Sequence, residues 1–171
     1  EYIGVKLLAI AIPKMKALKK FDVSGNKLFA QNAKHLIKRF TNNNVLQELN
    51  LSDNNISHNE HTIAMCDAIR TMGALTYLNM SENQMLWKEV GKALGDLLKA
   101  NSVLKTLDVS SNFDFSAGSL DFAGFASGIA DGIKNNGALE KLLIGANGPY
   151  AHVIAAGKAL GDAIAVNTVL K

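Results

Sequence analysis

The chain is built from one pattern that recurs about every thirty residues. In each unit a leucine is followed three and five residues later by apolar residues, and eight residues later by asparagine. The leading leucines, with a sixth near the end of the chain, are Leu18, Leu46, Leu75, Leu104, Leu139 and Leu170. The asparagines are Asn26, Asn54, Asn83, Asn112 and Asn147. A pattern that repeats at four places per unit indicates a stack of similar supersecondary units.

The second half of each unit has helical periodicity. Apolar residues stand ten and six residues before each leading leucine, as at Leu94 and Leu98. A separation of four places such a pair on one face of a helix. Asparagine stands three residues before four of the leading leucines. Because asparagine tolerates the left-handed conformation, we expect these residues in the turns that end the helices. They are Asn43, Asn101, Asn136 and Asn167.

Each unit is therefore predicted to be a short strand, a loop that turns on asparagine and an amphipathic helix of about three turns. One strand and one helix cannot bury their apolar faces alone, so neighbouring units must stack. A helix is about 10 Å wide and strands lie about 4.8 Å apart, so the stack curves with its sheet inside. The predicted fold class is α/β: a horseshoe segment of right-handed β-α units, with a parallel concave sheet and convex helices, in a single domain of residues 1–171.

The unit length of 28 or 29 residues, the LxxLxLSxN motif and helices such as residues 91–98 resemble the ribonuclease-inhibitor subfamily of leucine-rich repeats. That resemblance implies a cytoplasmic protein that binds another protein, without a cofactor and without enzymatic activity. Ribonuclease inhibitors, the Ran GTPase-activating protein, the tropomodulin C-terminal domain and the sensor ends of NOD-like receptors are similar in architecture. Two alternatives follow: a regulator of a GTPase or another nucleotide-cycle protein, and an actin-capping module.

Neither end of the sequence shows a polar capping repeat. The chain opens inside a predicted helix that has no preceding strand, and it closes at the start of a new strand. Solenoids need polar capping repeats to cover their terminal faces. We therefore predict a fragment of a longer array, or partner chains stacked on the ends, which includes end-to-end self-association.

Charge and hydrophobicity argue against nucleic-acid and membrane partners. The net charge is +3, but lysines and carboxylates are interspersed, and Arg39 and Arg70 are the two arginines. Arginine is the side chain best suited to phosphate and base recognition, so we predict no nucleic-acid binding. The apolar stretch 3–12 is too short to span a bilayer and lacks a basic leader, so we predict a soluble, cytoplasmic chain. One cysteine, Cys66, allows no intramolecular disulfide.

Side chains that alternate with the buried residues of each strand should point out of the concave face. Tyr77 is the best anchor among them, because tyrosine is enriched in binding hot spots. One column of this face is repeatedly Asp or Asn, which favours a structural role over a binding role for its members. They are Asp22, Asn50, Asn79 and Asp108. The candidate protein-binding residues on this face are Lys20, Glu48, Tyr77, Asn79, Thr106, Asp108, Lys141 and Leu143.

Extra residues between the fourth and fifth units give a second candidate site. Phe113, Phe115 and Phe122 lie in this insertion. Insertions in repeat proteins go to loops on one face, often the binding face. The three rings could dock a partner or pack as a small satellite core.

The sequence shows no catalytic constellation. His58 and His61 stand three residues apart, but a structural zinc site needs four suitable ligands, and Cys66 falls at a buried position of the repeat. The glycine-rich stretch 145–149 lacks the lysine and Ser/Thr of a phosphate-binding loop. Asp22 and Asp108 are three repeats apart, too far to act as a catalytic pair. We predict no metal and no cofactor.

Overall fold

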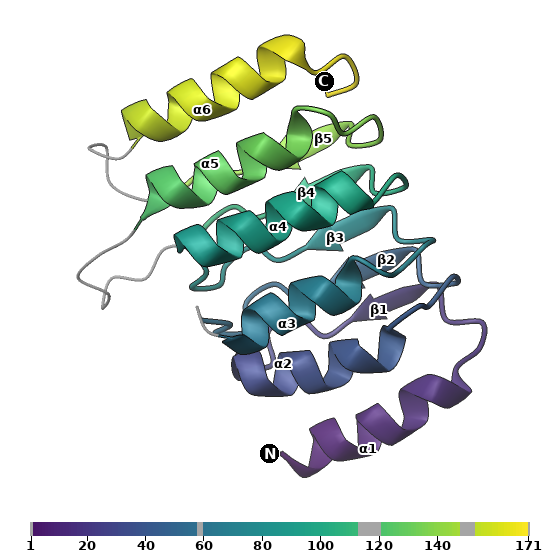
Figure 1. Cartoon of the computed structure of the whole chain (residues 1–171). Coiled ribbons are helices and arrows are strands. Elements are labelled where there is room, and N and C mark those ends of the chain that lie inside the picture. Colours follow the sequence, from purple (N-terminus) through teal and green to yellow (C-terminus); the bar gives the residue numbers. More distant parts are fainter. Residues whose placement is uncertain (1, 58–59, 113–120, 148–152, 171) are drawn as a thin grey trace.

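The computed structural model describes residues 2–57, 60–112, 121–147 and 153–170, and it has six α-helices and five strands over those residues (Figure 1). The α-helices are α1 (Ile3–Ala11), α2 (Phe29–Ile37), α3 (Glu60–Ile69), α4 (Lys88–Ala100), α5 (Phe122–Ile133) and α6 (Val153–Val166). The strands are β1 (Lys20–Asp22), β2 (Glu48–Asn50), β3 (Tyr77–Asn79), β4 (Thr106–Asp108) and β5 (Lys141–Leu143). Two 3-10 helices, η1 (Ile12–Lys14) and η2 (Lys38–Phe40), follow α1 and α2.

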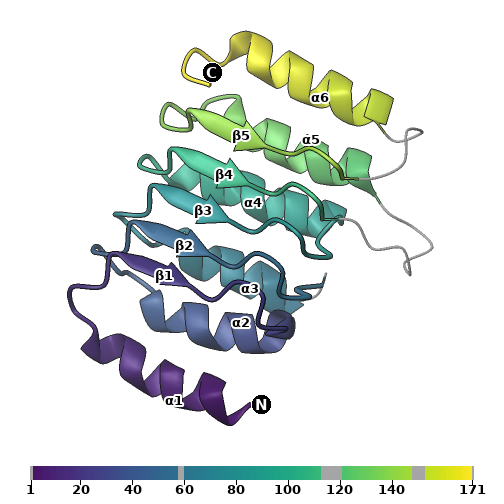
Figure 2. The same cartoon turned by 180° about the vertical axis from the view of Figure 1, so that it is seen from behind.

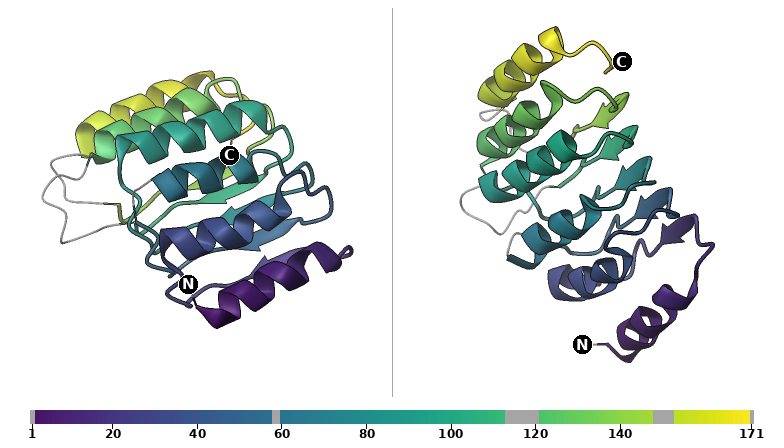
Figure 3. Two further views of the ribbon diagram at one scale, coloured as in Figure 1. Left: turned by 60° about the horizontal axis from the view of Figure 1, so that its bottom comes forward. Right: turned by 45° about the vertical axis from the view of Figure 1, so that its right-hand side comes forward.

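All five strands are parallel and lie in chain order in one sheet. Equivalent residues of neighbouring repeats pair, for example Glu48 with Tyr77 and Tyr77 with Thr106. The strands form one layer and the helices the other, with the sheet on the inside of the curve (Figures 2 and 3). The predicted fold class and strand register are confirmed.

The core lies between the two layers and follows the repeat. The leading leucines of repeats two to five have no exposed surface, and the central residues of β2, β3 and β4 are also buried. Fully buried residues of this set are Leu46, Leu49, Leu75, Leu78, Leu104, Leu107 and Leu139. Each repeat therefore contributes the same small group of side chains to a continuous apolar column.

The asparagines at the eighth position form a buried ladder that joins each repeat to the next. The Nδ2 of Asn83 donates to the carbonyls of Leu51, Met80 and Ser81, at 2.9 to 3.1 Å. Its Oδ1 accepts from the backbone N–H groups of Asn54 and Ile56, at 3.1 and 3.0 Å. One side chain thus binds five backbone groups, and it is the acceptor for two N–H groups that the loop would otherwise bury without a partner.

The asparagines at the helix ends act differently from the prediction. The backbone of Asn101 is extended, with φ −101°, so the expectation of a left-handed turn residue is wrong there. Its Oδ1 instead accepts from the N–H groups of Val103 and Leu104, at 2.9 and 2.8 Å. Asn43, Asn136 and Asn167 accept from the N–H groups two and three residues later in the same way. These residues fix the chain as it enters the following strand.

Helices α4 and α5 approach each other through glycine. A Cβ atom added at Gly95 would lie 2.1 Å from the carbonyl oxygen of Gly128, and one added at Gly128 would lie 2.3 Å from the carbonyl carbon of Gly91. Such distances leave no room for any side chain. Glycine at these positions therefore allows the close contact between the two neighbouring helices.

The thiol of Cys66 is buried in α3, as the repeat predicted. Burial raises its pKa from 9.0 to about 12, with the nearby charge of Asp67 a second cause. Because the thiolate is the reactive form, we expect a thiol reagent at about pH 8 to label the native protein far more slowly than the denatured chain. A raised folded-state pKa also means that this thiol's contribution to stability is complete below about pH 9 and is lost as the pH rises toward 12. Equal labelling rates in the two states would contradict this placement.

The terminal helices leave apolar side chains uncovered. On and beside α1 the exposed residues include Tyr2, Ile3, Leu7 and Ile10, and on α6 they are Ile154, Ile164 and Val166. Over the described residues, no helix is both long and apolar enough to cross a membrane.

Candidate functional site

Figure 2 shows the open sheet face, which the helices do not cover. The strand register aligns two rows of residues across this sheet. The first row comes from the first residue of each strand, and the second row from the third residue. The first row is Lys20, Glu48, Tyr77, Thr106 and Lys141. The second row is Asp22, Asn50, Asn79, Asp108 and Leu143.

The polar members of the second row hold the turns that follow their strands. The Oδ1 of Asn79 accepts from the N–H and the hydroxyl of Ser81, at 2.9 and 2.7 Å. Asp22, Asn50 and Asp108 bind the serine two residues later in the same manner. The backbone N–H of Ser24, followed by its hydroxyl, lowers the pKa of Asp22. The structural role thus accounts for Asn79 and Asp108, which the sequence analysis also offered as binding residues.

The side chains of the first row do not bind the serines of the turns in this way. Lys20 and Glu48 form an ion pair of 2.9 Å across β1 and β2, and both side chains are largely exposed. Tyr77 is half-buried beside them, and a shallow hollow of about 140 Å³ lies between Tyr77 and this pair. Thr106 continues the row on β4. A charged pair next to an aromatic side chain gives this row both a polar and an apolar contact surface.

The far end of the sheet face is more apolar. Lys141 is exposed and Leu143 is half-buried on β5, which pairs only with β4 among the described strands. Leu143 replaces the turn-binding Asp or Asn of the other repeats. The polarity of the sheet face therefore falls toward α6.

The insertion is described in part. Phe113 and Phe115 lie outside the described residues. Phe122 is the first residue of α5 and is 7% exposed, within the apolar core. For Phe122 the structure therefore supports packing and not docking.

The histidines do not gather a metal site among the residues that the structure describes. His61 lies 3.1 Å from the Nζ of Lys34, an arrangement that does not suit a cation ligand. His58 lies outside the described ranges.

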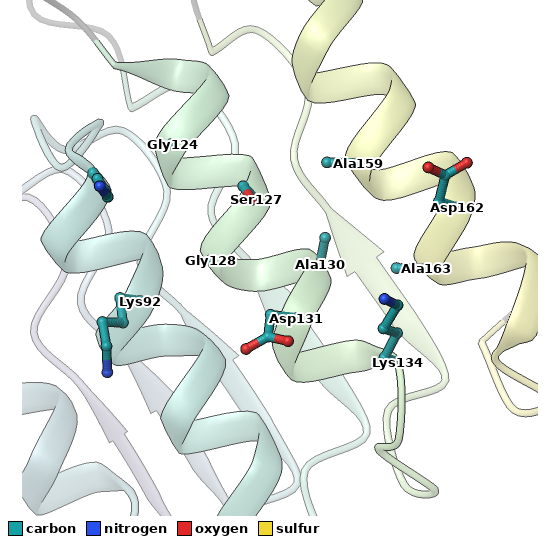
Figure 4. Close-up of a pocket in the computed structure, with 11 residues that line it drawn as sticks. Lys92, Gly124, Ser127, Gly128, Ala130, Asp131, Lys134, Ala159, Asp162 and Ala163 are labelled. Carbon is teal, nitrogen blue, oxygen red and sulfur yellow. The ribbon is translucent and has the colours of Figure 1, made fainter.

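The convex side has a hollow of about 480 Å³ above the outer face of α5 (Figure 4). Its floor consists of small residues such as Gly124, Ser127 and Gly128, with α4 and α6 as walls. Asp131 at its edge already pairs with Lys99. The hollow results from the small side chains of α5, and Asp162 in its lining pairs with Lys158.

Comparison with known proteins agrees with this architecture. A family model described as Leucine Rich repeat matches residues 42–58. The solved structure described as "Leiomodin-1 Actin-Binding Site 2" aligns with a TM-score of 0.69 over 96% of this chain and 91% of that chain, at 14% identity. The chain has the leucine-rich-repeat fold. The leucine-rich repeats of this chain also align with a tropomodulin C-terminal domain from Caenorhabditis elegans, with a TM-score of 0.64 over 94% of this chain and 93% of that chain, at 16% identity. No curated protein matched the sequence.

Sequence reasoning missed one surface. Five exposed cations gather where the first leucine-rich repeats turn from helix to strand: Lys14, Lys16, Lys19, Lys38 and Arg39. We call this set the basic edge. A count along the chain could have found it, because residues 1–40 hold nine of the eighteen lysines and arginines but two of the fifteen carboxylic residues.

Proposed function

We propose that this protein is a non-catalytic binding domain that holds a protein partner against the first row of its sheet face. The observation that carries the proposal is the difference between the two rows. The polar side chains of the second row bind the serines of the turns, whereas the first row presents Glu48, Tyr77 and Thr106 outward from adjacent strands.

The first row suits protein recognition in its chemistry. Tyr77 offers a ring and a hydroxyl on a rigid strand, and tyrosine is among the residues that dominate binding hot spots. The exposed Lys20–Glu48 pair offers both charges within one strand spacing. An exposed ion pair of this kind contributes little to stability, so it can be exchanged for contacts with a partner at small cost.

Actin is a second candidate partner. The structure that suggests it is leiomodin-1 actin-binding site 2, whose aligned region spans nearly all of this chain. At 14% identity the resemblance supports the fold, and actin binding by this chain is a separate proposal.

The first-row proposal is tested by affinity capture from a lysate of the source cell, followed by mass spectrometry. The test variant carries Glu48→Ala, Tyr77→Ala and Thr106→Ala. Its matched control carries Lys88→Ala, Glu89→Ala and Ser127→Ala, at exposed positions of α4 and α5. We expect one protein to be retained by wild type and control and lost from the test variant, because truncation of a hot-spot cluster costs about 2 kcal/mol or more. Equal retention by all three proteins would contradict the proposal.

Actin is tested directly by co-sedimentation with filaments and by a mobility shift with monomeric actin. Binding that the first-row variant loses would identify actin as the partner of this face. Binding that persists in that variant would separate actin from the first row, and no binding would remove actin as a candidate.

A further inference from the structure

The positive charge of the chain is concentrated at its first leucine-rich repeat. The net charge of the whole chain is +3, yet residues 1–40 carry nine cations against two carboxylic residues. One of these, Lys20, is already paired with Glu48. The five cations of the basic edge are exposed, and they form no ion pair with any residue of the described ranges.

The fold brings the five cations to one edge of the solenoid. Lys14, Lys16 and Lys19 come from the connection between α1 and β1, while Lys38 and Arg39 belong to η2. Cα atoms of η1 and η2 approach within 8 Å. The carbonyl oxygen of Lys19 accepts hydrogen bonds from the N–H groups of Gln47 and Glu48, at 2.8 and 2.9 Å. The two helix-to-strand connections therefore lie side by side.

The position of Lys38 carries the opposite charge in every later repeat. Lys38 stands eight residues before its leading leucine, and aspartate stands there in α3 to α6. Each of these aspartates pairs with a cation near it. The pairs are Asp67 with Arg70, Asp96 with Lys92, Asp131 with Lys99, and Asp162 with Lys158. Lys105 pairs with Glu140 farther along the edge. Five cations of the later repeats are thus ion-paired, whereas the five of the basic edge pair with no residue of the described ranges.

We propose that the basic edge binds an acidic segment of a protein partner, rich in aspartate and glutamate. Five neighbouring cations that form no ion pair with the described residues create a positive potential, which attracts carboxylates and speeds their association. This surface is distinct from the first row of the sheet face and does not depend on it.

A protein segment fits this edge better than a nucleic acid or a membrane. Nucleic-acid recognition relies on arginine and on aromatic stacking, whereas the edge has one arginine. The exposed aromatic residues of this region, Tyr2 and Phe29, lie at the helix N-termini, away from the edge. A membrane surface would need apolar side chains in the plane of the cations. One exposed apolar residue, Met15, lies among the cations. The other exposed apolar residues of this region belong to the terminal turns and body of α1 and to Phe29, whereas Lys38 and Arg39 follow α2.

Fluorescence anisotropy with a labelled oligo-glutamate peptide tests the proposal on the full chain. The edge variant carries Lys14→Gln, Lys38→Gln and Arg39→Gln. Its matched control carries Lys27→Gln, Lys88→Gln and Lys134→Gln, which are also exposed and remove the same charge. Circular dichroism checks that both remain folded. We expect the edge variant to bind the peptide at least about tenfold more weakly, and the control to change by less than about threefold.

A second measurement needs no variant. The affinity of the wild type for the peptide should fall steeply between about 50 and about 300 mM NaCl, because salt screens exposed charges. Equal losses in the edge and control variants, or salt-independent binding, would overturn the proposal. Tighter binding to a duplex DNA or to phosphatidylserine vesicles than to the peptide would also overturn it.

Discussion

Alanine at Gly95 is expected to destabilise the protein by about 3 kcal/mol, although alanine is the better helix former. The added Cβ would lie 2.1 Å from the carbonyl oxygen of Gly128, so α4 and α5 would have to separate. Separation exposes the apolar contacts that both helices make with the core. Thermal unfolding followed by circular dichroism should show a midpoint lower by roughly 6 to 12 °C.

Gly161→Ala is the matched control for this substitution. Gly161 stands at the same place of its repeat as Gly95, but a Cβ there would meet no atom within 4 Å. Only helix propensity then changes, and we expect the free energy of unfolding to rise by up to about 1 kcal/mol. If both substitutions changed stability in the same direction, that result would contradict the close contact between α4 and α5.

Removal of one asparagine from the buried ladder is expected to have a still larger effect. Asn83→Ala deletes three hydrogen bonds to carbonyls and two from N–H groups, all in a loop where Asn83 is 3% exposed. The carbonyls keep other donors, but the N–H groups of Asn54 and Ile56 lose their acceptor. Each buried group left unpaired costs about 1 to 3 kcal/mol, so we expect a total loss of about 4 kcal/mol. Denaturant unfolding measures this loss as a lower midpoint.

Asn26→Ala gives the comparison at the exposed end of the ladder. Asn26 donates to the carbonyls of Val23 and Ser24, at 3.1 and 2.9 Å, and water can replace those contacts because the side chain is exposed. We expect a loss of about 1 kcal/mol. Similar losses at Asn26 and Asn83 would show that the inter-repeat hydrogen bonds do not stabilise the stack.

The repeat alone predicts the sheet, because each strand must pair with its equivalent in the next unit. Tyr77 and Thr106 occupy the same place of successive repeats, and the structure pairs them. The leading leucines were likewise predictable as core residues, since a period shared by all units can only place them on the same face. Periodicity therefore suffices for the fold.

Contacts between repeats were less predictable. The repeat pattern could not show whether Asn79 faces a partner or binds Ser81, because an asparagine suits both roles. The predicted role of Asn101 was also wrong, since asparagine at this position is equally compatible with a side-chain acceptor and with a left-handed backbone. The basic edge was missed because its cations are separated along the chain and meet only when η1 and η2 stack.

The two proposed binding surfaces can be tested independently of each other. The first row lies on the sheet face, whereas the basic edge lies where helices end and strands begin (Figures 2 and 3). The first-row variant changes one net charge, and the edge variant leaves Glu48 and Tyr77 intact. Each variant is therefore an additional control for the other surface.

Site-specific photo-crosslinking at Tyr77 tests the central claim most directly. A photoreactive phenylalanine analogue replaces Tyr77 in one protein and Ser127, on the convex side, in another. The proposed function predicts a discrete crosslinked partner from position 77, reduced when Glu48 and Thr106 are also alanine, and none from position 127. A partner captured from position 127 and not from position 77 would contradict binding on the sheet face.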